Sequence, residues 1–467
     1  MTTSANDPRT TGAPAGSEDV PLSIAYLCYR GKPHVGGQGV YTRHLTKALA
    51  DLGHHVEVLG GPPYPVLDDR VPLVELPSLE IYNDYFPMRM PGIWELKSLG
   101  DWVEVTSFSF GNFPEPLAFS IRAWQHLRQR VNEFDLVQDN QCLGYGLLGM
   151  EWAGLPVLGT IHHPITVDRR LEMEHAETTW QRISKARWYA FTKMQTRVAG
   201  RLTRVLTVSE NSQKDINADH HVPFEKMHVV PVGVDQELFR PLPDVDRSPG
   251  RLITTASADV TMKGLRYLLE AIAKLRTERH IELVVIGKLK EGGQSARTID
   301  ELGLRDIVTF VSGVPEQRII ELYSEAEVAV VPSLYEGFSL PAIEAMSCGV
   351  PLVATTGGAL PEVVGADGDT ALLVPPGDSD ALAARIRTAL DDPDLRSAVG
   401  ARGRQRVIDR WTWRHTAVGT VEQYRALLAE TARIQARRPG GAGNAPRFSP
   451  RSSSRLTVPA VAEANGG

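Results

Sequence analysis

Short apolar runs alternate with helical patterns along most of the chain, and this alternation occurs in two successive blocks. In the first block, residues 22–29 form an apolar run, and the next segment places Tyr41, Leu45 and Leu49 on one helical face before Gly53 ends it. Because strands that alternate with helices build parallel sheets covered on both faces, the pattern predicts an α/β fold of two doubly wound, Rossmann-like domains. The other strands are expected within residues 55–60, 135–138, 156–161 and 204–209 of the first block and 252–257, 281–287, 307–313, 328–333 and 351–356 of the second.

The boundaries between the expected domains follow from changes in composition. The N-terminal domain is expected over residues 21–239 and the C-terminal domain over residues 251–414, because 467 residues exceed what one hydrophobic core usually supports. Residues 240–250 are rich in Pro and Asp and are interpreted as the linker. We also expect a terminal helix at 415–436 that packs back on the N-terminal domain, and disorder in the polar segments 1–20 and 437–467.

Composition and charge exclude several classes of protein. A net charge of −6 with 23% charged residues provides no general basic surface, so no nucleic-acid partner is expected. Cys28, Cys142 and Cys348 lack the spacing of metal ligands and are interpreted as buried residues of a protein in a reducing compartment. No apolar run reaches the roughly 18 residues that span a bilayer, and none near the N-terminus has the form of a signal peptide. We therefore expect a cytoplasmic protein.

The most specific pattern is the segment 332–351, PSLYEGFSLPAIEAMSCGVP, in which seven residues separate Glu336 from Glu344. Pro341 fits the first position of a helix, which places Glu336 in the preceding loop and Glu344 in the first helical turn. The unpaired N–H groups of such a turn suit a phosphate, and carboxylates suit the vicinal hydroxyls of a sugar. The alternative is a capped helix whose two acidic residues only complement its dipole. The backbone groups expected at the phosphate are those of Phe338, Ser339 and Leu340.

With this segment the chain resembles glycosyltransferase family 4, whose C-terminal domains carry two glutamates at this spacing followed by a small-residue turn. The resemblance covers most of residues 22–430 and implies a bacterial, retaining enzyme of the GT-B fold, in which the two domains face a central cleft. It further implies that Glu336 contacts the donor sugar, that Glu344 contacts the ribose, and that the backbone near Val314 meets the base. The other segments that carry the resemblance are 159–163, 229–235, 262–271, 309–314 and 354–364.

A glycine-rich segment near the N-terminus places Gly36, Gly37 and Gly39 between a strand and a helix. Backbone without Cβ atoms can approach a diphosphate closely, and in the resembled family this loop lies against the donor phosphates and the acceptor. A plain tight turn is the alternative. The dinucleotide-binding fingerprint fails because its third glycine would fall at Thr42, which argues against a nicotinamide-dependent enzyme.

A histidine and a lysine are the remaining candidates for catalysis. His162 and His163 follow the strand at 156–161, and the resemblance falls on His162, which can donate to a sugar hydroxyl or stabilise charge at the reacting centre. A structural histidine is the alternative, and it fits His163 better. Lys263 is expected at the start of a helix over residues 263–279, where it can neutralise a departing diphosphate.

This lysine lies where the chain departs from the family pattern Gly-Arg-x-x-x-x-Lys-Gly. Ala258 stands in the position of the family arginine, and Asp259 adds a negative charge beside it. Either another cation, Lys288 or Lys290, takes the place of the arginine, or catalysis is weakened.

No metal site and no cofactor are expected, because candidate acidic pairs of the Asp-x-Asp type, such as Asp244 and Asp246, lie in the expected linker, and Lys263 with a helix dipole can replace the cation. Residues 178–209 contain no acidic side chain. Six basic residues are expected on one face of a helix: Arg182, Lys185, Lys193, Arg197, Arg201 and Arg204. This face is interpreted either as a peripheral contact with anionic membrane or as an ordinary solvated helix.

Together these patterns predict a metal-independent, retaining hexosyltransferase that uses UDP-glucose or GDP-mannose and a glycan, glycolipid or small-molecule acceptor. Two alternatives stay open: a nucleotide-sugar epimerase or phosphorylase on the same architecture, and a sugar-nucleotide-binding protein whose activity has decayed. The base, the sugar and the acceptor depend on a few pocket contacts, each worth only about 1–3 kcal/mol.

Overall fold

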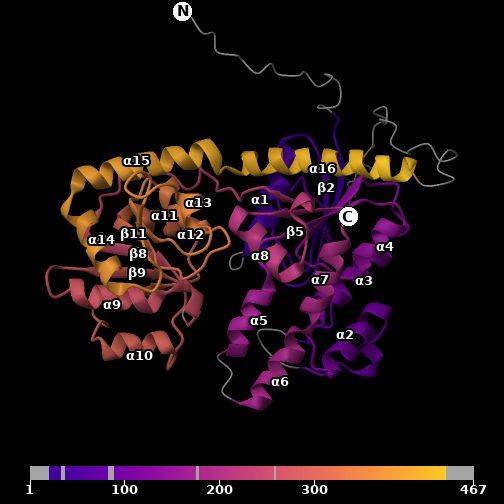
Figure 1. The fold of residues 1–467 in the computed structure, drawn as a ribbon, viewed down its shortest axis with the longest axis horizontal. Helices are drawn as coiled ribbons and strands as arrows, with labels where there is room; N and C mark the ends of the chain where they lie inside the picture. The colour runs from indigo at the N-terminus through magenta and orange to yellow at the C-terminus, as the bar shows by residue number, and fades with distance from the viewer. Residues whose placement is uncertain (1–19, 33–36, 82–88, 175–177, 257–258, 438–467) are drawn as a thin grey trace, which may run out of the picture.

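The computed structural model describes residues 20–32, 37–81, 89–174, 178–256 and 259–437. These residues form two α/β domains that lie side by side, the N-terminal one coloured indigo to magenta and the C-terminal one mostly orange (Figure 1). The predicted fold of two parallel-sheet α/β domains is therefore confirmed. The ends expected to be disordered, 1–20 and 437–467, lie outside the described residues apart from Val20 and Arg437.

The N-terminal domain is built on a seven-stranded parallel sheet in the order β3-β2-β1-β4-β5-β6-β7. Its central strands are buried along almost their whole length, which explains their continuous apolar sequence, because helices cover both faces. Two short edge strands, β3 and β7, are not among the predicted ones. The strands are β1 (Ser23–Cys28), β2 (His55–Gly60), β3 (Leu73–Glu75), β4 (Leu136–Asn140), β5 (Val157–Ile161), β6 (Arg204–Thr207) and β7 (Met227–Val229).

The C-terminal domain repeats this topology with a six-stranded sheet in the order β10-β9-β8-β11-β12-β13. Its first strand begins at Ser248, within the segment interpreted as the linker. The short edge strand β13 is again not among the predicted ones. The strands are β8 (Ser248–Thr255), β9 (Glu282–Ile286), β10 (Val308–Val311), β11 (Ala326–Val331), β12 (Leu352–Thr355) and β13 (Leu372–Val374).

Helices connect most of the successive strands, although β2 and β3 are joined without one, and several helices begin at a side-chain cap. Asp378, Asp392 and Thr412 each accept a hydrogen bond from a backbone N–H of the helix that follows. In the N-terminal domain the helices are α1 (Gly37–Asp51), α2 (Leu99–Ser109), α3 (Glu115–Leu127), α4 (Gly146–Trp152), α5 (Ile165–Glu174), α6 (Thr179–Trp188), α7 (Thr192–Arg201) and α8 (Glu210–His220). They are followed by α9 (Leu265–Leu275), α10 (Gln294–Glu301), α11 (Glu316–Glu325), α12 (Leu340–Ser347), α13 (Leu360–Val364), α14 (Ser379–Asp391), α15 (Pro393–Arg410) and α16 (Trp413–Ala436).

The chain passes between the domains twice, and the two crossings lie side by side. The Val234 N–H on the first crossing donates to the Trp411 carbonyl on the second over 2.8 Å. Glycine is required at 233, because a Cβ there would lie 2.3 Å from the Thr412 backbone. One hydrophobic core therefore continues from the α1 face of the first sheet into the second domain.

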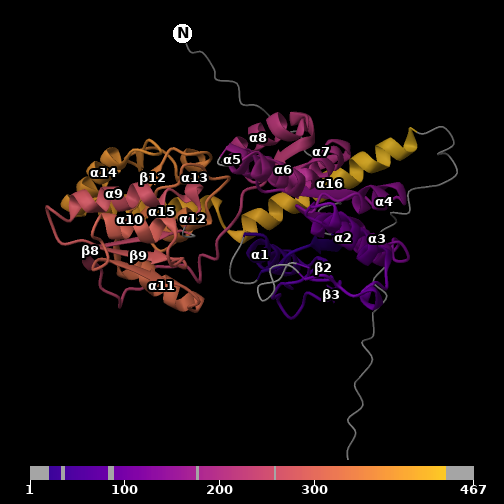
Figure 2. The ribbon, with the colours of Figure 1, turned by 90° about the horizontal axis from the view of Figure 1, so that it is seen from below.

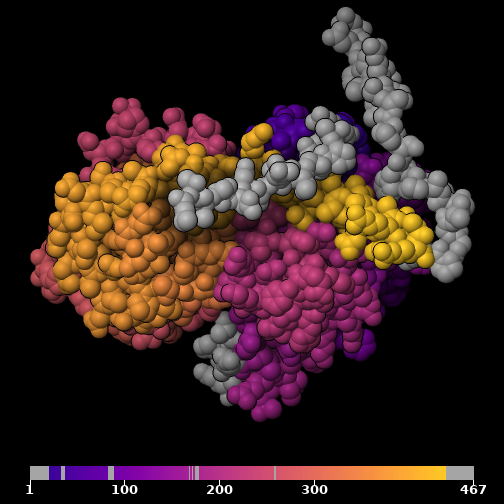
Figure 3. All heavy atoms as spheres, turned by 45° about the horizontal axis from the view of Figure 1, so that its top comes forward, coloured from indigo at the N-terminus to yellow at the C-terminus, as the bar shows by residue number. Residues whose placement is uncertain are grey.

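After the second crossing α16 returns to the N-terminal domain and packs against α1. Figure 2 shows α16 leaving the junction of the domains and running to the far end of the N-terminal domain, and Figure 3 shows it lying on the surface of that domain. Tyr424 anchors the helix, because its buried hydroxyl donates to the side-chain Oε1 of Gln138 in β4. The C-terminal helix therefore belongs to the N-terminal domain in space.

Two predicted helices differ from the structure. The helix expected over 263–279 is a 3-10 turn, η4 (Thr261–Lys263), followed by the shorter α9, because Gly264 adopts a left-handed φ of 65° between them. Lys263 therefore ends the turn and does not begin the helix. Residues 178–209 form α6, η2 (Tyr189–Phe191) and α7 instead of one helix, and Arg204 already belongs to β6.

Candidate active site

The loop between β11 and α12 lies at the junction of the domains, where the second sheet has its carboxyl end. Glu336 is at the centre of this loop, and its side chain is 10% exposed. Its Oε1 accepts hydrogen bonds from Lys263 Nζ over 2.9 Å and from Ser333 Oγ over 2.7 Å, so neither bond uses Oε2. The structure thus brings two of the predicted catalytic residues, Lys263 and Glu336, into one ion pair.

Close backbone contacts fix the position of this ion pair. Gly264 packs against Pro332 so tightly that a Cβ would lie 1.9 Å from the proline carbonyl oxygen. Gly358 packs on the other side of the loop, where a Cβ would lie 2.3 Å from the Glu336 carbonyl oxygen. Both glycines have positive φ, so any side chain there would be strained as well as crowded. The ring of Phe338 is buried at the second crossing, which leaves its backbone for the predicted contact with the donor.

The start of α12 presents the expected backbone groups in a strained conformation. Ser339 has a φ of 95° and a ψ of 86°, which costs a non-glycine residue free energy, and its buried Oγ has no hydrogen-bond partner within the described part of the chain. An unpaired buried hydroxyl suits a ligand with acceptor oxygens such as a phosphate. α12 begins at Leu340, so Pro341 is its second residue and Glu344 lies in its second turn. The predicted place of Glu344 in the first turn is therefore wrong.

Glu344 is connected to the sheet by a chain of hydroxyl groups. The Tyr323 hydroxyl donates to Glu344 Oε2 over 3.4 Å and is hydrogen-bonded to Thr255 Oγ1 over 3.1 Å. Burial raises the pKa of Glu344 from 4.5 to about 7, because the bond from Tyr323 does not offset the loss of hydration. Near neutral pH this carboxyl group therefore gains or loses its proton easily, and sugar hydroxyls can bond to either form.

His162 contributes a neutral imidazole at the carboxyl end of the first sheet. Its Nε2 lies 2.6 Å from Asn140 Oδ1, and because the same amide donates to Thr42 Oγ1, we assign the imidazole proton to Nε2. The ring packs edge-on against Tyr41 with centroids 4.5 Å apart. Desolvation lowers the pKa of His162 from 6.5 to about 4. At neutral pH this histidine therefore carries no positive charge, and its N–H is bonded within the protein; its catalytic role stays a prediction.

The N-terminal domain contacts the Glu336 loop through the start of α8. The Gly337 carbonyl accepts hydrogen bonds from Ser209 Oγ over 2.6 Å and from Ser212 Oγ over 3.1 Å. Glu362, in the other domain, accepts from the backbone N–H of Glu210 at 3.0 Å with both carboxylate oxygens. A carboxylate is favoured there by the positive end of the helix dipole. These contacts close the two domains over the site.

The residues of this contact are not singled out by the sequence alone. Ser209 follows a strand and precedes an acidic residue, a pattern typical of a helix N-cap, but an N-cap signal does not predict a bond to another domain. Tyr335 likewise donates its hydroxyl to Asp215 on α8 across the junction. Of these residues, Tyr335 and Glu362 lie in segments that carry the family resemblance.

The predicted donor-binding residues outside this loop have different outcomes. Gly36 lies outside the described residues, whereas α1 begins at Gly37, where a Cβ would meet no atom of the described residues within 4 Å. Gly39 faces protein, since a Cβ would lie 2.1 Å from the Lys32 carbonyl oxygen, which explains glycine there without a ligand. Val314 is partly exposed in the loop between β10 and α11.

The surroundings of the missing family arginine are described only in part. Ala258 lies outside the described residues. Asp259 Oδ1 accepts from the Ser295 N–H over 2.7 Å, so its charge stabilises the start of α10. Lys288 and Lys290 are exposed on the loop after β9, and their service as a substitute cation stays a prediction.

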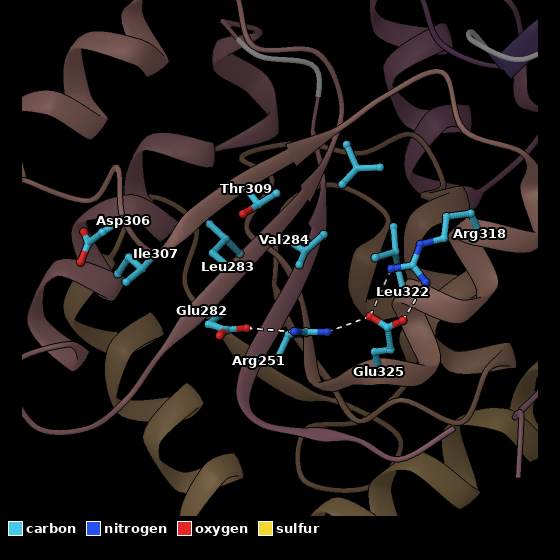
Figure 4. Close-up of a pocket in the computed structure, with 11 residues that line it drawn as sticks. Arg251, Glu282, Leu283, Val284, Asp306, Ile307, Thr309, Arg318, Leu322 and Glu325 are labelled. Atoms are coloured by element: carbon cyan, nitrogen blue, oxygen red, sulfur yellow. Dashed lines mark hydrogen bonds and ion pairs between the residues drawn. The ribbon is translucent and has the colours of Figure 1, made fainter. Parts of the chain in front are cut away.

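A hollow of about 290 Å³ lies elsewhere in the C-terminal domain, beside α11 and mainly at the amino ends of β9 and β10 (Figure 4). Arg251 pairs with Glu282 and Glu325, and Arg318 also pairs with Glu325, so these charges neutralise one another. Ligands of open α/β sheets bind at the carboxyl ends of strands. We therefore do not place the active site in this hollow.

The basic residues between 182 and 204 do not share one helical face, so this prediction is wrong. Lys185 pairs with Glu172 at 2.7 Å, and Arg204, on β6, pairs with Glu430 of α16 at 3.5 Å. Contact of α6 and α7 with an anionic membrane stays a prediction. Among the helices in the described part of the chain, none is long and apolar enough to cross a membrane.

Comparison with known proteins defines the class to which this fold and site belong. The family model "Glycosyl transferases group 1" matches residues 246–406, and the model "Glycosyltransferase Family 4" matches residues 35–238. Among solved structures, a sucrose-phosphate synthase from Thermosynechococcus elongatus has a TM-score of 0.65 at 24% identity and covers 87% of this chain and 100% of its own. Anabaena HepE in complex with UDP-glucose has a TM-score of 0.61 at 19% identity and covers 88% and 100%. The fold is therefore the GT-B fold of glycosyltransferases.

Sequence relatives identify the family. Over 412 residues the chain is 47% identical to "MMP alpha-(1->4)-mannosyltransferase" of Mycolicibacterium hassiacum, which covers 88% of this chain and 100% of the relative. It is 26% identical over 416 residues to "D-inositol 3-phosphate glycosyltransferase" of an Arthrobacter species, covering 85% and 92%. The chain belongs to glycosyltransferase family 4, as the resemblance of its motifs implies.

Replacing Glu344 with Gln should stabilise the protein at high pH and leave its stability almost unchanged at low pH. The raised pKa means that the folded state holds this proton more tightly than the unfolded state does, so Glu344 favours folding below about pH 4.5 and this contribution is lost as the pH rises through about 7. We measure the midpoint of thermal unfolding of both proteins from pH 5 to pH 8. The midpoint of the variant minus that of the unaltered protein should therefore increase as the pH rises. Glu291→Gln, at an exposed site, should show no such trend; a constant difference would contradict the assigned burial of Glu344.

Replacing Glu362 with Gln should weaken the closed arrangement of the domains. A carboxylate at a helix N-terminus contributes up to about 1–2 kcal/mol, so kcat/KM should fall roughly fivefold or more, and the radius of gyration from small-angle X-ray scattering should increase. Glu210→Gln is the matched control, since its exposed side chain begins the same helix without spanning the junction. Equal effects of the two changes would show that the contact does not hold the domains.

Proposed function

We propose that this protein is a retaining mannosyltransferase that moves mannose from GDP-mannose to a mannose-containing glycan through an α-(1→4) bond. The observation that carries the proposal is the 47% identity to a relative named MMP α-(1→4)-mannosyltransferase, along that relative's whole length. Because the identity extends over both domains, it covers the residues on the donor side of the cleft and those on the acceptor side. It favours GDP-mannose over UDP-glucose, the other donor that the sequence analysis left open.

The geometry of the Glu336 loop supports transfer from an activated donor. Lys263 Nζ uses one of its three N–H groups on Glu336, which leaves two for the oxygens of a departing diphosphate. The backbone N–H groups at Ser339 and Leu340 add the positive end of the α12 dipole. Glu336 Oε2 accepts from a hydroxyl of the donor sugar, and Glu344 accepts from the ribose.

Electrostatics make Lys263 the principal cation of this proposed site. His162 is neutral near pH 7, so it can act as a hydrogen-bonding group but not as a counter-ion to the diphosphate. Lys263 and the α12 dipole then take the place of a metal ion, and turnover should persist in the presence of a chelator. In this proposal the acceptor hydroxyl attacks the donor sugar from the face on which the phosphate departs. The departing phosphate helps to remove the proton of that hydroxyl, and the configuration at the transferred sugar is therefore retained.

Incubation with a panel of nucleotide sugars and mannose oligosaccharides tests the proposal. GDP-mannose should release GDP and extend the oligosaccharide, and NMR should show an α-linkage in the product. A β-linked product would contradict retention, and preference for another donor would contradict mannosyl transfer. Donor turnover without an acceptor would indicate an epimerase, dependence on free phosphate a phosphorylase, and tight binding without turnover a binding protein.

Lys263→Met should lower kcat by at least about 10²-fold, because removal of one preorganised stabilising group from an active site typically costs 10²- to 10³-fold. The change also leaves the nearly buried Glu336 without its partner, so the unfolding midpoint is measured alongside. Lys263→Arg, which keeps the charge, should retain more activity and stability. Lys274→Met is the matched control, since this exposed lysine of α9 pairs with Ser379 and Asp380. A Lys263→Met enzyme with more than about a tenth of the original kcat would contradict the placement of the diphosphate.

A further inference from the structure

Asn140, the last residue of β4, lies fully buried between the first turn of α1 and the ring of His162. Its Nδ2 is 3.2 Å from the Gln38 backbone carbonyl oxygen and 3.0 Å from Thr42 Oγ1. The Thr42 hydroxyl donates its proton to the same Gln38 carbonyl over 2.8 Å, so its oxygen can accept from the amide. Because a backbone carbonyl can only accept, the amide nitrogen must face it, and this fixes the orientation of the amide. Asn140 therefore turns Oδ1, an acceptor, toward His162.

This orientation leaves the second ring nitrogen of His162 as an acceptor. Nε2 donates to Asn140 Oδ1 over 2.6 Å, so in the neutral ring Nδ1 carries a lone pair and no proton. Among the described residues no group bonds to Nδ1, and this nitrogen is not one of the buried atoms that lack a partner, so solvent can reach it. His162 lies beside the Glu336 loop, since a Cβ at Gly337 would be 3.1 Å from the His162 carbonyl oxygen. An accessible acceptor therefore lies at the cleft.

The groups around the ring of His162 are uncharged at neutral pH. Loss of hydration lowers the pKa of His162 to about 4, and no charged side chain of the described residues contributes to that shift. Tyr41 packs against the ring and Cys28 lies beside Asn140, and burial raises the pKa of both, that of Cys28 to about 11. Asp139, the neighbour of Asn140 in β4, points to the opposite face of the sheet. A carboxylate placed beside the ring would therefore dominate its titration.

We propose that Asn140 is a positioning residue that holds His162 with its proton on Nε2, so that Nδ1 accepts a hydrogen bond from a sugar hydroxyl in the cleft. His162 thus accepts from the sugar, whereas the sequence-based expectation was that it donates. This inference rests on the proposed function, because a sugar must occupy the cleft. It makes the amide essential, since an imidazolium has two N–H groups and no acceptor.

Asn140→Asp tests the proposal, because it keeps the shape of the side chain and adds a charge. A carboxylate beside the ring stabilises the imidazolium, so His162 should be protonated at pH 7 and Nδ1 should no longer accept. At pH 7 the kcat/KM of the variant should then be about tenfold lower than that of the unaltered enzyme. The ratio of the two values should recover as the pH rises and the ring loses its proton.

Two further variants test whether the effect passes through His162. In a His162→Gln background, Asn140→Asp should no longer change the pH dependence of kcat/KM. Asn112→Asp is the matched control, since this partly buried amide on the loop between α2 and α3 bonds to Ser107 over 3.2 Å and should leave the pH dependence unchanged. A loss in Asn140→Asp that is equal at every pH, or that persists with the same pH dependence in the His162→Gln background, would overturn the positioning role.

Nitrogen NMR of the enzyme labelled in its histidine rings separates this inference from the proposed function, because it needs no substrate. The His162 signals are assigned by their loss in His162→Gln. In the unaltered enzyme Nε2 should carry the proton and Nδ1 none from pH 6 to pH 8, and in Asn140→Asp both nitrogens should be protonated at pH 7. If these spectra are found but no sugar is transferred, the proposed function fails and the role of Asn140 stands. A proton on Nδ1 of the unaltered enzyme, or a mixture of both forms, would overturn it even if Asn140→Asp does not fold.

Discussion

The geometry of the cleft depends on how the Glu336 loop is held between the domains. Lys263 restrains the side chain through an ion pair, and the serines at the start of α8 restrain the next carbonyl, that of Gly337. The side chain is almost buried, and a buried carboxylate without a partner is strongly destabilising, so the lysine is needed for the shape of the loop as well as for charge. A donor that engages the same lysine therefore acts on a group whose position the fold has already determined.

Several groups of the site are held in states that folding alone would disfavour. Ser339 has a left-handed backbone conformation and an unpaired hydroxyl, Glu344 has a raised pKa, and His162 has a lowered one. Such strain and perturbed titration concentrate at functional sites, because ligand binding there can recover the free energy that the fold does not. All three groups lie near the carboxyl ends of the sheets, where open α/β folds bind ligands. The strained and perturbed groups therefore lie where this type of fold binds ligands.

The sequence predicts the parts of the fold that local pattern determines. Long buried strands such as β1 and β9 are predicted from their apolar runs, whereas the edge strands β3, β7 and β13 are too short to give a pattern. The predicted start of the helix at residue 263 is wrong. The sequence pattern includes Gly264 in the helix, whereas in the structure its positive φ separates η4 from α9.

In the site, too, the sequence predicts the residues of local motifs but not the contacts between distant segments. Lys263 and Glu336 are predicted from motifs that lie in separate segments, and the structure adds that they pair. The bonds from Ser209 and Ser212 to Gly337 are not predictable, because they join residues more than a hundred positions apart across two domains. Gly39 is a related case, since the crowding backbone of Lys32 already explains the glycine, and its contact with the donor stays a prediction.

The central claim is that the cleft around the Glu336 loop holds the donor. Its most direct test is a crystal structure of the enzyme with GDP and a mannose oligosaccharide. The account predicts the diphosphate within hydrogen-bonding distance of Lys263 Nζ and the backbone N–H groups at Ser339 and Leu340, with the ribose hydroxyls at Glu344. A diphosphate bound elsewhere, for example in the hollow beside α11, with the pair of Lys263 and Glu336 left in contact only with each other, would contradict it.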